Sequence, residues 1–139
     1  MNFLHLTTPA TLLVSIAIAA ALIYLPYLLV AFGRFSVGFD MGAPRASFDK
    51  LPDYAKRANW AHQNSIETFP PYAAAALMAY TTQQFTAEAA HLALAFVAAR
   101  FLFSVFYIIK FTIGSSLMFG IGSFATISLM IASIRSALG

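Results

Sequence analysis

The sequence predicts an all-α integral membrane protein, built as an antiparallel four-helix bundle, and three observations lead to this prediction. Hydrophobic residues make up 60% of the 139-residue chain and charged residues only 9%, whereas a soluble domain carries about 25% charged residues. Apolar segments recur that are long enough to cross a bilayer, which takes about 20 residues. Two of the three connections between these segments are short, so that neighbouring helices should be antiparallel.

The first apolar segment predicts a helix over about residues 8–32. It contains Pro26, which removes one backbone donor but is tolerated in membrane helices. The only long connection follows, over residues 33–52, and it mixes glycine, proline and charged residues. This composition is typical of a loop at the membrane interface rather than of a folded domain.

Three more helices are expected along the rest of the chain, within a single domain over residues 1–139. The second, over about 53–82, begins with polar residues, becomes rich in alanine and contains a Pro-Pro pair. The third, over about 86–110, starts at Thr86, a suitable N-cap residue. The fourth, over about 115–136, carries glycine and serine residues that allow close helix packing.

The composition also excludes several kinds of site. The chain has no cysteine, which excludes disulfides and thiolate metal ligands. No histidines or carboxylates stand at metal-binding spacing, so no metal site is expected. The net charge of +3 comes from basic residues that form no concentrated patch, so nucleic acid is not an expected partner. His62 lies on a different helical face from Asn64, which suggests an interface position for it.

The distribution of basic residues predicts the orientation in the membrane. Most of them lie in or beside the first loop or at the turn between the third and fourth segments, at Arg34, Arg45, Lys50, Lys56, Arg57 and Lys110. The opposite end has only Arg135. Basic residues favour the cytoplasmic side, so we expect a cytoplasmic loop and both termini outside the cytoplasm. A topology reporter fused after Gly139 would test this orientation.

Polar side chains in the middle of apolar helices are the candidate site. In the second helix Arg57, Asn64 and Glu67 share one face, because they are spaced by seven and three residues. In the third helix Arg100 and Tyr107 share a face in the same way. Counting residues from the helix ends places Glu67 at the depth of Arg100, which predicts a buried ion pair, and places Asn64 closer to Tyr107. The alternative is that this pair only joins two helices.

These residues carry a resemblance to a known family. The run from Arg57 to Pro70, with Ala61-His62-Gln63-Asn64 and Glu67 inside it, is followed by Arg100 and Tyr107 in the third helix. This combination resembles the membrane-associated proteins in eicosanoid and glutathione metabolism, the MAPEG family, and most of all its small bacterial members. The resemblance covers essentially the whole chain, including the four helices and the long first loop.

The resemblance implies a homotrimer in a bacterial inner membrane, and the distribution of basic residues then makes both termini periplasmic. It implies that glutathione binds at the subunit interface and that a lipophilic small molecule reaches it from the membrane lipids. Asn64 and Glu67 match positions that hold glutathione, and Arg34 matches a basic position more loosely. Arg57 and Arg100 would bind carboxylates of the cofactor. Tyr107, with Arg100, would carry the chemistry of a transferase or peroxidase by donating to the sulfur or to the substrate oxygen.

The sequence also departs from the family pattern. Trp60 and Gln63 stand where many members carry arginine, and Phe103 replaces a polar or hydroxyl-bearing residue. Residues 114–116, where the eicosanoid enzymes place an arginine that stabilises the glutathione thiolate, contain no basic residue. A thiolate at neutral pH needs a nearby cation or strong donors. Two functions therefore remain open: a glutathione-dependent membrane enzyme, or a non-catalytic lipid-binding or scaffold member of the same family.

Overall fold

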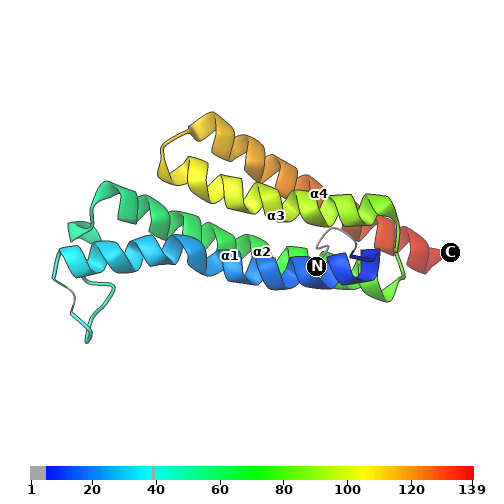
Figure 1. Cartoon of the computed structure of the whole chain (residues 1–139), viewed down its shortest axis with the longest axis horizontal. Coiled ribbons are helices and arrows are strands. Elements are labelled where there is room, and N and C mark those ends of the chain that lie inside the picture. Colours follow the sequence, from blue (N-terminus) through cyan, green and yellow to red (C-terminus); the bar gives the residue numbers. More distant parts are fainter. Residues whose placement is uncertain (1–5, 39) are drawn as a thin grey trace.

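The computed structural model describes residues 6–38 and 40–139, and within them the chain is helical, with no strand (Figure 1). The elements are α1 (Thr8–Ser36), a short 3-10 helix η1 (Phe48–Lys50), α2 (Asp53–Thr81), α3 (Ala87–Ile108) and α4 (Thr112–Leu138). The predicted all-α bundle of four long helices is confirmed.

The four helices form two hairpins that lie against each other (Figure 1). α1 packs mainly against α2, and α3 packs mainly against α4. The long α1–α2 loop and the α3–α4 turn lie at one end of the molecule, while the C-terminus and the α2–α3 turn lie at the other (Figure 1). Antiparallel neighbours follow from the short α2–α3 and α3–α4 connections, because few residues allow only a reversal of direction.

Both short turns end a helix with a residue in the left-handed region that is not glycine. Gln83 follows α2 with φ 56° and Lys110 follows α3 with φ 67°. At each turn a backbone N–H reaches back five residues, from Gln84 to the carbonyl of Ala79 and from Phe111 to that of Phe106, both at 2.8 Å. These bonds satisfy carbonyls that the helix end would leave unpaired. They also stop α3 at Ile108, two residues before the end that the sequence predicts.

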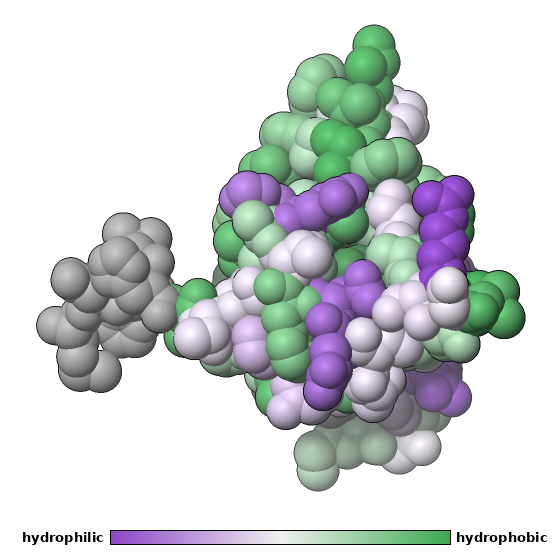
Figure 2. Space-filling model, turned by 90° about the vertical axis from the view of Figure 1, so that its right-hand side faces the viewer, coloured by the Kyte–Doolittle hydropathy of each residue, from purple (hydrophilic) through white to green (hydrophobic). Residues whose placement is uncertain are grey.

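Three of the helices, α1, α3 and α4, are long and apolar enough to cross a membrane. The expectation that all four segments have this character is wrong for α2, which has 29 residues but a polar first half. Large apolar side chains on the other helices are exposed, for example Leu28 (65%), Phe124 (67%) and Ile113 (79%). Figure 2 looks onto the end that carries the C-terminus, where hydrophilic residues gather at the centre and apolar residues surround them. This pattern suits helices whose sides face lipid and whose ends face water.

The core divides into a larger cluster and a smaller one. The larger cluster centres on Tyr72, which is fully buried, stacks on Phe96 at 3.6 Å between ring centroids and shares a hydrogen bond of 2.5 Å with Ser15. The smaller cluster joins the loop end of α1 to the start of α2. There Gly33 permits a close approach, because a Cβ atom at this position would lie 2.5 Å from the Cβ of Ala55.

Candidate functional site

Polar contacts between α2 and α3 follow the antiparallel register of the two helices. Asp53 faces Lys110 in an ion pair of 3.4 Å, and both side chains are exposed. One turn along, the Arg57 Nε donates to the backbone carbonyl of Tyr107 at 2.7 Å. Further into the bundle, Arg100 donates to Asn64. As the residue number rises along α2 it falls along α3, so these contacts belong to one continuous seam.

Arg100 is the most firmly held polar residue of this seam. Its side chain is buried, with 4% of the residue exposed. Nη2 donates to Asn64 Oδ1 at 2.8 Å and approaches Ser65 Oγ at 3.4 Å. The guanidinium carbon lies 4.4 Å from the centre of the Phe103 ring, a favourable cation–π distance. A buried charge with these partners stays in one place, and it fixes the orientation of the Asn64 amide.

The predicted Glu67–Arg100 ion pair is not formed. Within the described residues, the only ion pair is the exposed one between Lys110 and Asp53, and Glu67 is itself exposed. The expectation that Asn64 lies nearer to Tyr107 is wrong for the same reason: Asn64, and not Glu67, faces Arg100. Glu67 lies one helical turn beyond Asn64, so its carboxylate remains available to a ligand.

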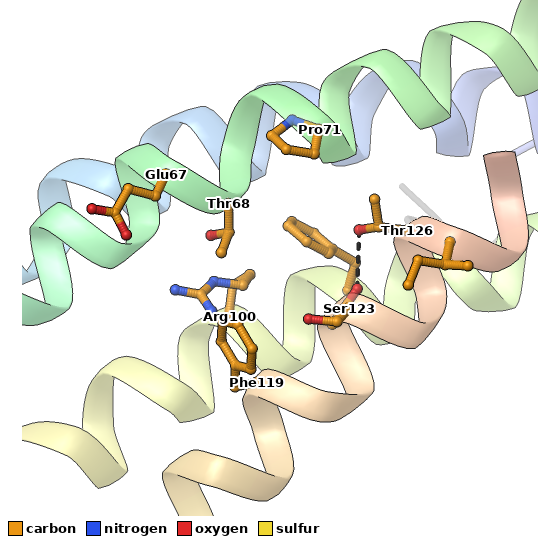
Figure 3. Close-up of a pocket in the computed structure, with 10 residues that line it drawn as sticks. Glu67, Thr68, Pro71, Arg100, Phe119, Ser123 and Thr126 are labelled. Carbon is orange, nitrogen blue, oxygen red and sulfur yellow. Dashed lines mark hydrogen bonds between the residues drawn. The ribbon is translucent and has the colours of Figure 1, made fainter.

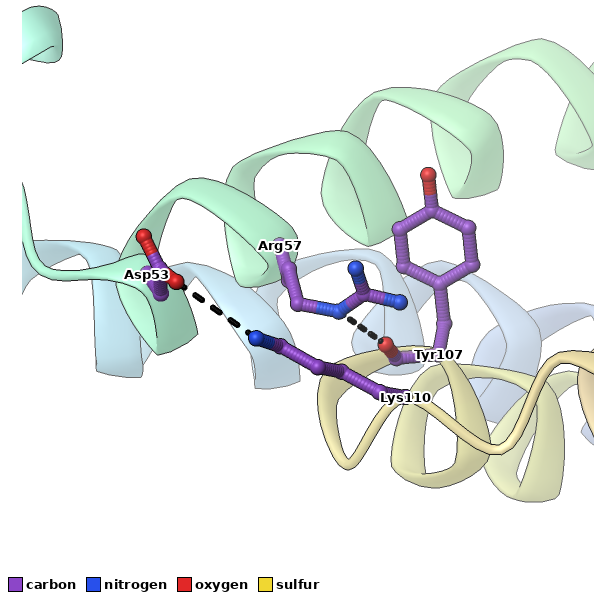
Figure 4. Close-up of polar contacts among 4 residues, drawn as sticks. All are labelled: Asp53, Arg57, Tyr107 and Lys110. Carbon is purple, nitrogen blue, oxygen red and sulfur yellow. Dashed lines mark hydrogen bonds and ion pairs between the residues drawn. The ribbon is translucent and has the colours of Figure 1, made fainter.

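Arg57 and Tyr107 are brought together, as the sequence predicts for a shared site (Figure 4). Besides its bond to the Tyr107 carbonyl, the Arg57 guanidinium carbon lies 5.1 Å from the centre of the Tyr107 ring. Tyr107 also stacks on Phe103, with ring centroids 5.5 Å apart. Figure 4 shows the Tyr107 ring rising from α3 toward α2. Arg57 therefore fixes the position of the phenol as well as contributing a positive charge.

A cavity of about 220 Å³ opens between α2, α3 and α4 beside this seam. Its lining includes Glu67, Thr68, Arg100 and Ser123 together with apolar side chains. In Figure 3 the Glu67 carboxylate and the Arg100 guanidinium lie at the same end of the cavity. Gly122 of α4 also lines the cavity. A Cβ atom added at this position would lie 3.7 Å from the Cδ of Arg100, so α4 packs closely against α3 here. The cavity thus joins an apolar space to a free carboxylate and a fixed cation.

Two prolines change the backbone chemistry next to Glu67. Pro70 and Pro71 lie inside α2, and proline has no N–H to donate to the carbonyl four residues earlier. The carbonyls of Ile66 and Glu67 therefore lack their usual donors within the helix. Together with the Glu67 carboxylate they form a group of acceptors, which attracts ammonium and amide N–H groups.

Arg34 lies apart from most of the other predicted site residues. It lines a second, larger cavity of about 1110 Å³ between the end of α1, the loop and α2. Its Nη1 donates to the Tyr27 hydroxyl at 3.0 Å. Glu67 also lines this cavity, but Arg57, Asn64, Arg100 and Tyr107 do not. Within this chain, α2 therefore separates Arg34 from the cations of the α2–α3 seam.

His62 has a structural partner that sequence reasoning did not identify. Its Nδ1 lies 2.6 Å from the carbonyl oxygen of Ile23, and its ring contacts Tyr27 at 5.1 Å between centroids. A carbonyl can only accept, so Nδ1 carries the hydrogen and the neutral ring keeps Nε2 as an acceptor. The signal in the sequence was Pro26, since a proline disturbs helical hydrogen bonds and exposes carbonyls one turn before it. His62 thus links α2 to the proline region of α1.

Comparison with known proteins agrees with this arrangement. The model of the MAPEG family matches residues 11–135, nearly the whole chain. No curated protein and no solved structure matches the chain. Three long apolar helices together with the family match make the chain an integral membrane protein. The bundle, the polar seam between α2 and α3, and the match over residues 11–135 lead to one conclusion: this chain belongs to the MAPEG family.

Proposed function

We propose that the protein is a membrane-bound, glutathione-dependent transferase or peroxidase that acts on lipophilic substrates. Family membership supports glutathione-related chemistry at a membrane. The observation that carries the proposal is the exposed Glu67 carboxylate beside the buried Arg100 on the wall of one apolar cavity. Glutathione has an ammonium group, two carboxylates and peptide N–H groups, which need acceptors and cations close together.

The structure suggests a distinct role for each site residue in this proposal. Glu67 and the carbonyls freed by Pro70 and Pro71 would hold the ammonium and amide groups of glutathione. Arg57 would bind a carboxylate, because it lies closer to the end of the bundle than Arg100. The Arg100 side chain already holds Asn64, so it would orient that amide and add positive potential to the cavity.

Tyr107 is the proposed catalytic residue. Its ring is fixed between Arg57 and Phe103, and a phenol can donate a hydrogen bond to a thiolate sulfur or to a substrate oxygen. The lipophilic substrate would approach from the membrane, since the cavity beside Arg100 is mostly apolar. In the proposed homotrimer, Arg34 could reach this site only from a neighbouring protomer.

One observation favours a second function, that of a non-catalytic lipid-binding or scaffold protein. Residues 114–116 at the start of α4 carry no basic side chain. In the antiparallel register Phe119 lies beside Phe103, so Ser116, one turn earlier, lies near the level of Tyr107. This is where a cation would lower the pKa of a bound thiol most effectively. Without that cation the thiol of bound glutathione would remain mostly protonated.

We therefore expect weak glutathione binding with little thiolate, and a gain of thiolate in Ser116→Arg. Ultraviolet difference absorbance of the glutathione complex measures the thiolate directly. Each unit by which a cation lowers the pKa of a thiol above neutral raises its thiolate fraction about tenfold. The matched control is Ser136→Arg, which adds the same charge at the far end of α4 and should leave the signal unchanged.

Two outcomes would contradict this expectation. A strong thiolate signal in the wild-type protein would show that Tyr107 and Arg57 already replace the missing cation. Absence of glutathione binding by the wild type and by Ser116→Arg would support the scaffold function instead. Glu67→Gln provides an independent check, since it removes the proposed ammonium partner and should weaken binding by about tenfold or more.

The proposed trimer can be tested separately. The exposed polar residues of α2, above all Glu67 and Gln63, would be costly against lipid and suit a surface between subunits. We expect a mass of three chains in a mild detergent, measured by light scattering with correction for bound detergent. A stable monomer that binds glutathione as tightly as the assembled protein would contradict a site completed by a neighbouring subunit.

A further inference from the structure

The cavity beside Arg100 is a cleft with a buried floor and an exposed rim. Its floor lies on α3 and α4, where Phe96, Arg100 and Gly122 are buried. Its rim includes exposed residues on both sides, Glu67 of α2 and Phe119 of α4. Figure 3 shows α2 on one side of the cleft and α4 on the other. A molecule that entered between these two helices would therefore bury one end against α3 and keep the other end at the rim.

Most of the polar groups in the cleft are already bonded to the protein. The hydroxyls of Thr68 and Thr126 donate to carbonyls of their own helices, at 2.9 and 3.0 Å. The Arg100 guanidinium donates to Asn64. The interior of the cleft is therefore suited to an apolar group, while the free carboxylate of Glu67 marks its polar end.

The volume of the cleft limits the size of that apolar group. It is about 220 Å³, whereas a dry apolar cavity of about 150 Å³ in another protein binds benzene. One ring with a short substituent fits this space, but three fused rings do not. Phe96 and Phe119 supply aromatic surface, and the Arg100 cation attracts the face of an aromatic ring. These neighbours favour an aromatic ring over an alkyl chain of the same size.

From this arrangement we propose that the cleft binds the apolar part of the substrate, and that Gly122 and Phe119 restrict this part to one aromatic ring. The inference rests on the proposed function, since the substrate would be the electrophile that glutathione attacks at the Glu67 end. Gly122 keeps the floor open. A Cβ atom added there would meet Phe96 and Arg100 at an ordinary contact distance of 3.7 Å, so a larger side chain could fill the cleft without moving the backbone.

A benzylic chloride shows what this restriction would do to the reaction. The glutathione sulfur would bond to the benzylic carbon as the carbon–chlorine bond breaks, chloride would leave, and the thiol proton would pass to water. With the ring in the cleft, the benzylic carbon would lie at the rim. Benzyl chloride should therefore react faster than 9-(chloromethyl)anthracene, by about tenfold or more once each rate is divided by its uncatalysed rate.

The cleft can also be probed without glutathione, because the chain has no cysteine. Ser123→Cys places one thiol on the wall of the cleft. The full chain in dodecyl maltoside is treated with benzyl or anthracen-9-ylmethyl methanethiosulfonate. The protein thiol forms a mixed disulfide and releases methanesulfinate, and mass spectrometry follows this labelling with time.

The matched control for this labelling is Phe124→Cys. Phe124 lies on the same helix but is 67% exposed, so a thiol there should react with both reagents. Relative to this control, we expect the benzyl reagent to label Ser123→Cys about tenfold or more faster than the larger reagent, because excess volume is not accommodated in a packed interior.

Two further variants in the Ser123→Cys background test the size limit. Gly122→Leu should slow benzyl labelling about tenfold, because leucine would fill the floor of the cleft. Phe119→Ala should have the opposite effect and bring labelling by the larger reagent to within about threefold of benzyl labelling, because it opens the rim. Phe119 is exposed, so this variant remains informative if Gly122→Leu does not fold.

The possible results separate this proposal from the proposed function. Equal labelling of Ser123→Cys by the two reagents, relative to Phe124→Cys, would overturn the size limit. A thiol that neither reagent reaches would also overturn it, because the cleft would then be closed or covered by a second copy of the chain. Size-selective labelling without glutathione-dependent turnover would support the cleft as a site for one ring and reject the proposed enzymatic function. Equal turnover of the two chlorides would show that the substrate binds elsewhere, and would overturn the proposal.

Discussion

Replacing Tyr72 with alanine is expected to lower the free energy of unfolding by about 3–5 kcal/mol, the range for deleting a buried aromatic side chain. Tyr72 is fully buried, and its ring stacks on Phe96 of α3. Its hydroxyl bonds to Ser15 of α1 and lies 3.5 Å from the Ala93 carbonyl. One residue of α2 therefore joins three helices, and its loss would leave a cavity at their junction. Unfolding in mixed dodecyl sulfate micelles measures the change.

The ring and the hydroxyl of Tyr72 should contribute unequally. Tyr72→Phe keeps the stacking and loses only the hydrogen bond, which is expected to cost about 1 kcal/mol. The cost stays low because the Ser15 hydroxyl also donates to the Leu12 carbonyl. Phe124→Ala is the matched control, since Phe124 is 67% exposed and faces away from the core. A loss in Tyr72→Ala no larger than that in Phe124→Ala would show that the core is not centred on Tyr72.

The bundle could be predicted from the sequence because its signals are strong and local. Long apolar runs, short connections and the low charge content all lead to the same architecture. The predicted face that holds Arg57 and Asn64 is also present, since helical periodicity fixes which residues share a side. Both residues contact α3, as their position on one face requires.

The pairing of polar residues could not be predicted with the same accuracy. The depth of a residue in the sequence depends on the expected helix ends, but α3 ends at Ile108 because Lys110 adopts a left-handed conformation without being glycine. An error of two or three residues shifts the register by about 3–5 Å. Arginine has a long side chain, so it can also bond one turn away from its own Cα level. Together these effects are enough to exchange Glu67 for Asn64 as the partner of Arg100.

The larger cavity, which Arg34 lines, could not be predicted from the sequence for a different reason. It depends on how the loop folds over the end of α1 and the first half of α2, and the loop has no periodicity that would predict this. The resemblance to the MAPEG family is what places Arg34 with Arg57 among the residues expected to bind glutathione. The structure places Arg34 on the other side of α2 from Arg57 and Arg100, where it lines the larger cavity and donates to the Tyr27 hydroxyl.

The bond from Arg100 to Asn64, in place of the expected ion pair with Glu67, allows a prediction about stability. Replacing Asn64 with leucine is expected to lower the free energy of unfolding by about 1.5–3 kcal/mol, the contribution of a hydrogen bond to a charged group. The buried guanidinium would keep only the longer contact of 3.4 Å with Ser65 and the ring of Phe103. Glu67→Gln should change the stability by less than about 0.5 kcal/mol, because Glu67 is exposed and makes no ion pair.

A double-mutant cycle separates pairing from packing. Arg100→Met alone removes the charge and leaves the Asn64 amide without its donor, and adding Asn64→Leu removes the amide as well. The double variant should then be more stable than the sum of the single losses predicts, by about 1 kcal/mol or more, since contacting residues do not contribute additively. The same cycle with Glu67→Gln in place of Asn64→Leu should be additive. Coupling of Arg100 to Glu67 but not to Asn64 would show that Arg100 pairs with Glu67. That result would contradict the register of α2 and α3 in which Arg100 bonds to Asn64.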